Sequence, residues 1–246
     1  MIWLFISNPF DFRNLLPMKP AFVDLSHSLD DHVQVYPGDP IFSCCPALTI
    51  ESDGLNVHQI SMGSHTGTHV DAPYHFVEGG AKIDEVSLDS FIGNVVVIDV
   101  TNKCPKEHIT WNDIAPSEDL IRRKAALEHG VFVFLHTGWS KHWQSDTYLE
   151  HPFLTRDAAQ RLIDLGVKAV GVDTLSPDET RVDGSIPDFG VHEVVLKAGL
   201  ILAENLTNLG SIQDGDWLVS LVPLKLKGCD GSPVRAFASR SMVGSP

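Results

Sequence analysis

The sequence predicts an α/β fold: a single domain around a mixed, barrel-like β-sheet flanked by helices. Two observations lead to this prediction. Short runs rich in β-branched and aromatic residues recur along the chain, and several are apolar on both faces, as in strands that are covered on two sides. These runs dominate the first third of the sequence, whereas helical patterns alternate with them in the middle, which is typical of an α/β sheet.

The strand-like runs are expected to supply the sheet. They cover residues 21–26, 55–65, 94–100, 131–137, 168–174, 200–205, 216–226 and 235–243. No stretch approaches the roughly 20 consecutive apolar residues that span a bilayer, so no membrane segment is predicted.

Three helices are predicted between these strands. The clearest covers residues 156–165, with Thr155 as its N-cap and Gly166 at its end, and it leads directly into the run KAVGVDT. A second helix covers residues 117–130. A third runs from Asp188, as its N-cap, to Gly199.

The 246 residues are expected to form one domain, because they contain neither internal repeats nor a linker rich in proline and glycine. We predict a domain at 20–246, preceded by an N-terminal extension at 1–19. That extension lacks the basic start and the cleavage site of a secretory signal. The four cysteines, at 44, 45, 104 and 229, do not suggest a disulfide framework, so we expect reduced thiols and a cytoplasmic protein.

The charge of the chain excludes one class of partner. Thirty-two acidic residues against eighteen basic ones leave a formal charge of −14. Such a charge opposes binding to nucleic acid or to an anionic membrane, and we expect neither as a partner.

The segment SHTGTHVDAPYH, residues 64–75, contains several residues that are candidates for metal binding or proton transfer. His65, His69, Asp71 and His75 are separated by even numbers of residues, so an extended chain would present them on one face. A straight strand would hold the first two about 13 Å apart, too far for easy chelation of one ion. Gly67 and Pro73 can bend the chain, which favours a shaped site over a plain strand.

Imidazole nitrogen and carboxylate oxygen together suit Zn²⁺, Mn²⁺ or Fe²⁺. His65, His69 and Asp71 would hold the ion and leave a position open for water, whose pKa the ion lowers. His75, beyond the proline, is then available as a general acid/base. The alternative is that the four residues merely face solvent; it would be preferred for a single histidine, but not for this spacing.

The residues of this segment resemble the H-x-G-T-H-x-D-x-P-x-H signature of the metal-dependent cyclase family, which includes bacterial-type kynurenine formamidases and isatin hydrolases. The similarity continues through DLSHSL, VYPGDP, FLHTGWS, GVDTLSPD, AENLTNL and PLKLKGCDGSPVRAFA. It implies a fold of the swivelling β/β/α type, with His65, His69 and Asp71 as metal ligands and His75 as the acid/base.

The resemblance also implies a second metal site. His192 in FGVHEVVLKAG and Glu204 in LILAENL match the two later ligands of kynurenine formamidases, and Asp71 would then bridge two ions, Zn²⁺ or Mn²⁺. The residue pattern by itself supports Glu204 better than His192. A carboxylate that follows the apolar run LILA is expected to be buried, and a buried charge requires a partner or an ion.

The implied activity is hydrolysis of a small amide, with N-formylkynurenine as the first candidate, by a metal-bound hydroxide and His75. Tyr36 in VYPGDP stands where kynurenine formamidases tend to have a tryptophan that lines the substrate pocket. The alternatives are a lactam or lactone hydrolase of the same family, and a non-catalytic metal-binding member. Relatives form homo-oligomers, so we expect a dimer or a larger assembly.

Two further groups of residues leave alternatives open. Asp173, Thr174 and Ser176 follow a predicted buried strand, where functional groups gather, but a simple turn before Pro177 explains them equally well. Trp139, His142 and Trp143 could line a substrate pocket or pack as a surface loop.

Overall fold

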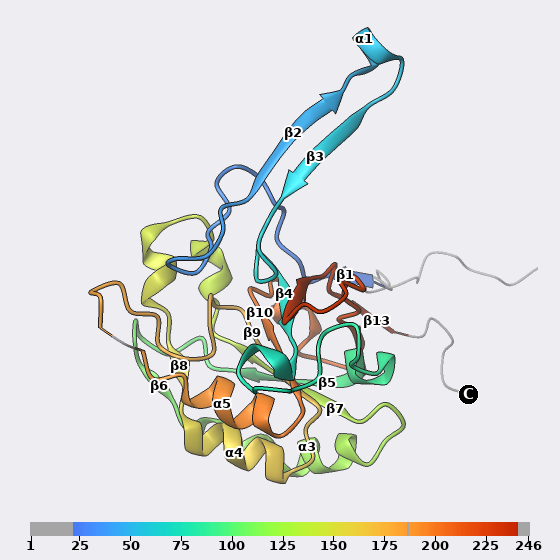
Figure 1. Ribbon diagram of the computed structural model, residues 1–246. Coiled ribbons are helices and arrows are strands. Elements are labelled where there is room, and N and C mark those ends of the chain that lie inside the picture. Colours follow the sequence, from blue (N-terminus) through green and yellow to red (C-terminus); the bar gives the residue numbers. More distant parts are fainter. Residues whose placement is uncertain (1–21, 186, 241–246) are drawn as a thin grey trace, which may run out of the picture.

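A curled, mixed β-sheet forms the centre of the molecule (Figure 1). The computed structural model describes residues 22–185 and 187–240, so the predicted extension at 1–19 lies outside the described residues. Within them nine strands form the sheet, in the order β1 (Phe22–Asp24), β13 (Phe237–Ser239), β11 (Leu218–Ser220), β5 (Ile92–Asp99), β7 (Val131–His136), β9 (Ala169–Val172), β10 (Ile201–Glu204), β4 (His69–Asp71) and β12 (Gly231–Pro233). The described residues form one domain, and the predicted α/β class with a barrel-like mixed sheet is confirmed.

The middle of the sheet is parallel and its two sides are antiparallel. Strands β5, β7, β9 and β10 run parallel, and β7 and β9 are buried along almost their whole length. This burial explains why their sequences, VFVFLH and AVGV, are apolar on both faces.

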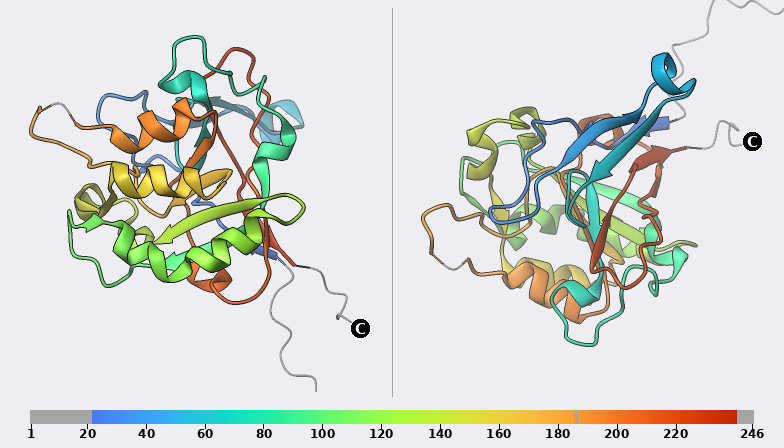
Figure 2. Two further views of the ribbon diagram at one scale, coloured as in Figure 1. Left: turned by 90° about the horizontal axis from the view of Figure 1, so that it is seen from below. Right: turned by 45° about the horizontal axis from the view of Figure 1, so that its top comes forward.

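Helices cover one face of the parallel strands. These are α3 (Glu118–Ala125), α4 (Arg156–Asp164) and α5 (Gly190–Lys197), which lie side by side in Figure 2. Their apolar side chains pack in one core with the strands. A second core, which includes the fully buried Trp217 and Phe91, fills the inside of the curled sheet. The α4 prediction is confirmed: the Thr155 side chain accepts from the Ala158 N–H, and Gly166 turns the chain at φ +80°.

Short elements complete the fold around the sheet. They are a two-stranded sheet of β6 (His108–Ile109) and β8 (Phe153–Leu154), the helical turn α2 (Trp111–Ile114), and the 3₁₀ turns η2 (Pro73–His75), η3 (Leu88–Phe91), η4 (Ala115–Ser117), η5 (Trp139–His142), η6 (Asp146–Glu150) and η7 (Leu209–Ile212). Among the residues that the structure describes, no helix is long and apolar enough to cross a membrane. All four cysteines are free.

A hairpin projects away from the body of the molecule (Figure 1). It consists of β2 (Ser43–Leu48), the helical turn α1 (Ile50–Asp53) and β3 (Val57–Ser61), and every residue of the two strands is exposed. The prediction of one strand over 55–65 was therefore too long, because the β2–β3 ladder ends at the pair Ser43–Ser61. The sequence did not indicate β2, since SCCPAL contains a proline and has no buried face to impose an alternating pattern.

Other boundaries differ from prediction where the backbone cannot continue a ladder or a helix. The predicted strand 216–226 is reduced to β11, because Pro223 has no N–H to donate and forms only an isolated bridge with Val234. The predicted strand 235–243 contains β13, and residues 241–243 lie outside the described part. The predicted helix 117–130 ends at Ala125, since His129 and Gly130 adopt positive φ angles before β7.

The N-terminus of α5 corrects a further prediction. Asp188 does not cap this helix; it is exposed and lies 3.5 Å from Arg156. The cap comes from Asp178, which accepts from the backbone N–H groups of Val191 at 2.8 Å and His192 at 3.0 Å. A residue twelve positions before the helix thus satisfies its free N–H groups, which local sequence spacing does not reveal.

We predict that Asp178→Ala destabilises the metal-free protein by about 2–4 kcal/mol, because it leaves two buried backbone donors unsatisfied. Asp188→Ala, the matched control, should change the free energy of unfolding by less than about 0.5 kcal/mol, as expected for an exposed ion pair. Urea unfolding of both variants measures the difference. Equal effects would contradict the assignment of the cap.

Candidate metal centre

The residues expected to bind metal meet where β4, β10 and α5 come together. Strand β4 pairs antiparallel with β10, and the register sets His69 opposite Glu204. Directly paired residues of antiparallel strands project their side chains to the same face. Helix α5 places His192 beside them: its Nε2 lies 3.2 Å from Glu204 Oε1 and 3.5 Å from Asp71 Oδ2.

His65 reaches this cluster through a turn and not along a strand. Only His69–Asp71 of the segment 64–75 is extended, and the chain turns on both sides of this strand, as predicted from Gly67 and Pro73. Gly67 makes the bend at φ +65°, where a Cβ would collide with Leu29. The turn brings His65 Nδ1 to 2.7 Å from Asp71 Oδ1. The predicted role of Gly67 as the bend is confirmed.

Hydrogen bonds fix the rings of His69 and His192. His69 Nδ1 donates to the carbonyl oxygen of Gly67 at 2.8 Å, and His192 Nδ1 donates to Asp178 at 2.7 Å. Carbonyl and carboxylate oxygens only accept, so these nitrogens carry the hydrogen and the Nε2 atoms face Asp71 and Glu204. Metal-binding histidines are commonly oriented in this way by an acceptor on the second nitrogen.

The cluster contains buried polar atoms that form no hydrogen bond. They are His69 Nε2, Asp71 Oδ2 and Glu204 Oε1. Leaving such atoms unpaired costs free energy, so their convergence indicates a missing partner. Nitrogen and carboxylate oxygen form a donor set suited to a divalent transition ion. The residues present therefore fit a metal.

The ligand atoms lie close enough for one ion or two. The groups His65–His69–Asp71, Asp71–His75–His192 and His65–His75–Asp230 each hold atoms within 4.8 Å of one another. Asp71 belongs to the first two groups, as expected of a bridging carboxylate.

Opposing effects set the protonation of these groups. Burial would lower the pKa of His65 and His69, but the neighbouring carboxylates raise it to about 10 for His65 and about 9 for His69. Burial alone would raise the pKa of Asp71, yet His65, His192 and His69 hold it well below its usual range. Protons on the imidazoles thus balance the buried carboxylates, and a bound cation would displace such protons.

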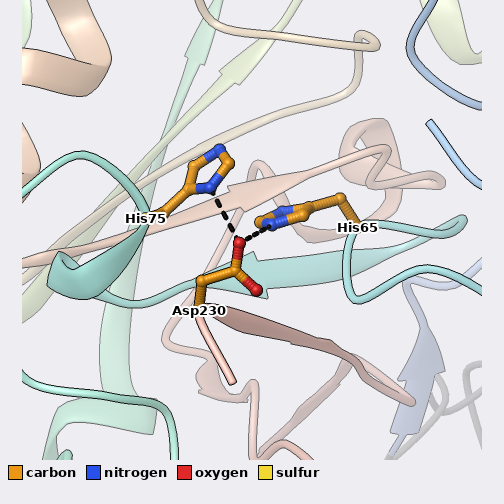
Figure 3. A group of neighbouring side chains, drawn as sticks. All are labelled: His65, His75 and Asp230. Atoms are coloured by element: carbon orange, nitrogen blue, oxygen red, sulfur yellow. Dashed lines mark hydrogen bonds and ion pairs between the residues drawn. The ribbon is translucent and has the colours of Figure 1, made fainter. Parts of the chain in front are cut away.

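His75 lies at the edge of the cluster. It ends the turn η2, and its Nδ1 is 3.1 Å from Asp230 Oδ2. The same oxygen is 3.0 Å from His65 Nε2 (Figure 3). The His65 and His75 rings stand 4.0 Å apart, centroid to centroid.

A cavity of about 250 Å³ opens onto these residues. Its aromatic wall comprises Tyr36, Phe76 and Phe189, and Phe76 stacks on His192 with ring centroids 4.8 Å apart. The remaining lining residues are polar: Asp39, His65, His75, Ser176, His192 and Glu204. The cavity therefore combines flat apolar surfaces with the possible ligands.

The structure brings together all the residues that the sequence singled out as ligands, and it places His75 and Tyr36 at the same cavity. Asp173 lies apart: it accepts hydrogen bonds from Thr137 and Gly138 and joins the ends of β7 and β9. Trp139 and Trp143 pack with Tyr148 and do not line the cavity. Of these open cases, only Ser176 belongs to the cavity.

Sequence reasoning missed two acidic residues of the site, Asp178 and Asp230. Both stand in segments that carry the family resemblance, GVDTLSPD and GCDGSPVRAFA, but each is an aspartate beside a turn residue, a common arrangement with no chemical signature of its own. Only their hydrogen bonds to His192, His65 and His75 distinguish them.

Comparison with known families gives a match over most of the described chain. The family model "Cyclase: Putative cyclase" matches residues 23–179. Kynurenine formamidase of Geobacillus thermodenitrificans is 34% identical over 223 residues, which are 89% of this chain and 97% of that protein.

Solved structures resemble the fold as a whole. Isatin hydrolase A from Labrenzia aggregata, bound to benzyl benzoate, superposes with a TM-score of 0.76 at 28% identity and covers 88% of this chain and 92% of its own. A potential metal-dependent hydrolase with cyclase activity superposes with a TM-score of 0.68 at 29% identity, over 89% of this chain and 98% of its own.

Proposed function

Because the chain belongs to the Cyclase family and is an amidohydrolase, we propose that it hydrolyses the C–N bond of a small aromatic amide in a metal-dependent reaction. An arylformamide such as N-formylkynurenine is the first candidate substrate, since relatives that are 34% and 32% identical carry the name kynurenine formamidase. The observation that carries the proposal is the set of unpartnered ligand atoms beside an aromatic cavity.

Five side chains would hold the metal: His65, His69, Asp71, His192 and Glu204. Zn²⁺ and Mn²⁺ both suit this donor set. His65, His69 and Asp71 would hold one ion. His192, whose Nε2 lies 3.5 Å from Asp71 and 3.2 Å from Glu204, would hold a second ion together with these two carboxylates. When bound, such an ion lowers the pKa of a water molecule and polarises the acyl carbonyl.

His75 is the proposed acid/base. Its Nδ1 is bonded to Asp230, so its Nε2 is free to exchange a proton with the reacting groups in the cavity. It would take a proton from the attacking water and deliver one to the leaving amine, so that the products are a carboxylic acid and an amine.

The aromatic wall suits a flat substrate. Phe76, Phe189 and Tyr36 offer ring surfaces against which an arene can pack. The Tyr36 hydroxyl is buried and has no hydrogen-bond partner. We assign it to a polar group of the substrate, because a buried hydroxyl gains most from a partner that arrives with the ligand.

A lactam hydrolase is the second candidate. The isatin hydrolase fold is shared, and a cyclic amide presents the same acyl carbon and the same flat ring to the cavity. The non-catalytic alternative is set aside, since the chain is an amidohydrolase.

The cytoplasm remains the proposed compartment, supported by four free cysteines, and fractionation of cells that express the chain would test it.

A second copy of the chain is the proposed partner of the projecting hairpin. A two-stranded hairpin without a covered face is marginally stable in water. Strands β2 and β3 contain no Asp, Glu, Lys or Arg, although the chain carries a charge of −14, so this surface can meet its copy without repulsion. Exposed Ile60 pairs with Cys44 near its base and offers apolar surface.

We expect chelator-stripped protein to regain N-formylkynurenine hydrolysis on addition of Zn²⁺ or Mn²⁺. His69→Ala should lose metal, whereas His75→Ala should keep the metal and lose about 10²–10⁴-fold in kcat. Metal analysis and initial rates on the same samples measure both effects, with exposed His129→Asn as the matched control. Turnover of isatin in place of the formamide would favour the lactam alternative, and an active His75→Ala would remove the acid/base role.

Tyr36→Phe should raise KM for the arylformamide about 2- to 10-fold, the effect of one lost hydrogen bond. Its thermal stability should not fall, because the deleted hydroxyl has no partner in the protein. Tyr74→Phe, whose ring is exposed, should leave KM unchanged. An unaltered KM for Tyr36→Phe would contradict the contact with substrate.

Ile60→Lys should convert the assembly to monomers, because it places like charges in the proposed contact between hairpins. Light scattering after size exclusion gives the mass. Leu127→Lys, at an exposed turn far along the chain from the hairpin, should preserve the assembly. A monomeric wild-type protein, or an assembly unchanged by Ile60→Lys, would overturn the proposed interface.

A further inference from the structure

We propose that Asp230 is a positioning residue that sets the ring orientation of both His65 and His75. The proposal rests on the proposed function, because it concerns the same site, and it explains why two rings from separate turns share one carboxylate oxygen. Figure 3 shows both interactions ending on Asp230 Oδ2.

The fold holds the Asp230 carboxylate firmly. The backbone carbonyl oxygen of Asp230 accepts from the Ala72 N–H at 2.8 Å, and the next residue, Gly231, pairs with Asp71 in the sheet. On the side-chain side, Ser64 Oγ donates to Oδ1 at 2.8 Å, which leaves Oδ2 for the histidines. Asp230 is therefore held to the segment 64–75 by its backbone at Ala72 and by its side chain at Ser64.

The chemistry of the carboxylate fixes where the hydrogens lie. An ionised carboxylate only accepts, so His65 Nε2 at 3.0 Å and His75 Nδ1 at 3.1 Å must each donate to it. His65 then turns Nδ1 toward Asp71 Oδ1, at 2.7 Å. His75 keeps Nε2 free. One oxygen thus directs one nitrogen of His65 to the ligand cluster and one nitrogen of His75 to the cavity.

The neighbouring glycine makes room for this arrangement. A Cβ at position 231 would lie 2.8 Å from His65 Cε1 and 2.8 Å from the Val70 carbonyl oxygen. A larger residue at this position would require the His65 ring or the β4 backbone to shift. The close approach of ring and backbone is thus built into the chain beside the carboxylate.

Asp230 does not line the cavity, which distinguishes positioning from direct participation in the reaction. The group His65–His75–Asp230 could in principle hold a metal of its own. Metal content separates these roles. Removal of a ligand carboxylate lowers the number of ions bound per chain, whereas removal of a positioning carboxylate weakens metal binding without changing that number.

The test compares Asp230→Asn and Asp230→Ala with Asp84→Asn. Asp84 accepts from the Gly228 N–H, so it supports the same loop without touching a histidine. We expect both Asp230 variants to keep the metal stoichiometry, to bind zinc about 10- to 100-fold more weakly and to lose a similar factor in kcat with little change in KM. Asp84→Asn should leave all three quantities unchanged.

A spectroscopic readout makes the test independent of turnover. Imidazole ¹⁵N–¹H NMR at mildly alkaline pH, with and without zinc, should show His75 as the Nδ1–H tautomer in the wild type and a mixture of tautomers in Asp230→Ala. An unchanged His75 tautomer in that variant would overturn the proposal, as would equal losses in Asp84→Asn, and loss of one ion per chain would make Asp230 a ligand. Failure of the wild type to hydrolyse arylformamides would refute the proposed function and leave the tautomer result standing.

Discussion

The antiparallel pairing of β4 with its two neighbours is the constraint on which the rest of the site depends. On one side β10 sets Glu204 opposite His69, and on the other β12 starts beside Asp71 and carries Asp230 just before it. The strand is only three residues long, so the turns at either end decide where His65 and His75 stand. A one-residue slip in the β4–β10 pairing would send the Glu204 carboxylate to the opposite face of the sheet, and the donor set would not form. A slip in the β4–β12 pairing would displace Asp230 in the same way.

The same pairing creates an electrostatic demand. Asp71 and Glu204 are buried together, and like charges in such surroundings require compensation. Three imidazoles surround the two carboxylates, and their pKa values are raised. Without an ion, the protonated rings therefore supply the positive charge that the carboxylates require. The centre therefore consists of acceptors and ligands oriented for a cation. The Asp178 carboxylate has two roles: it caps α5, and it orients the His192 ring that this helix carries.

The cavity and the projecting hairpin are connected through the chain. Tyr36 and Asp39, which line the cavity, stand shortly before β2, and His65 follows β3 by four residues. Both ends of the hairpin therefore lead directly into the site. A copy of the chain bound to the hairpin would restrain these two segments, which gives a physical route by which assembly could stiffen the cavity without contributing to the chemistry.

The sequence by itself determined the apolar strands, the capped helix predicted at 156–165 and the pattern of possible metal ligands in residues 65–75, because burial on two faces, N-cap chemistry and the spacing of histidine and aspartate are local properties. Resemblance to the family added His192 and Glu204. Tertiary structure alone decided the rest: which aspartate caps α5, how short the strands around Pro223 and Ser61 become, and that Asp230 joins His65 to His75. These features depend on contacts between residues that are distant in sequence, and no local propensity encodes a partner 155 residues away.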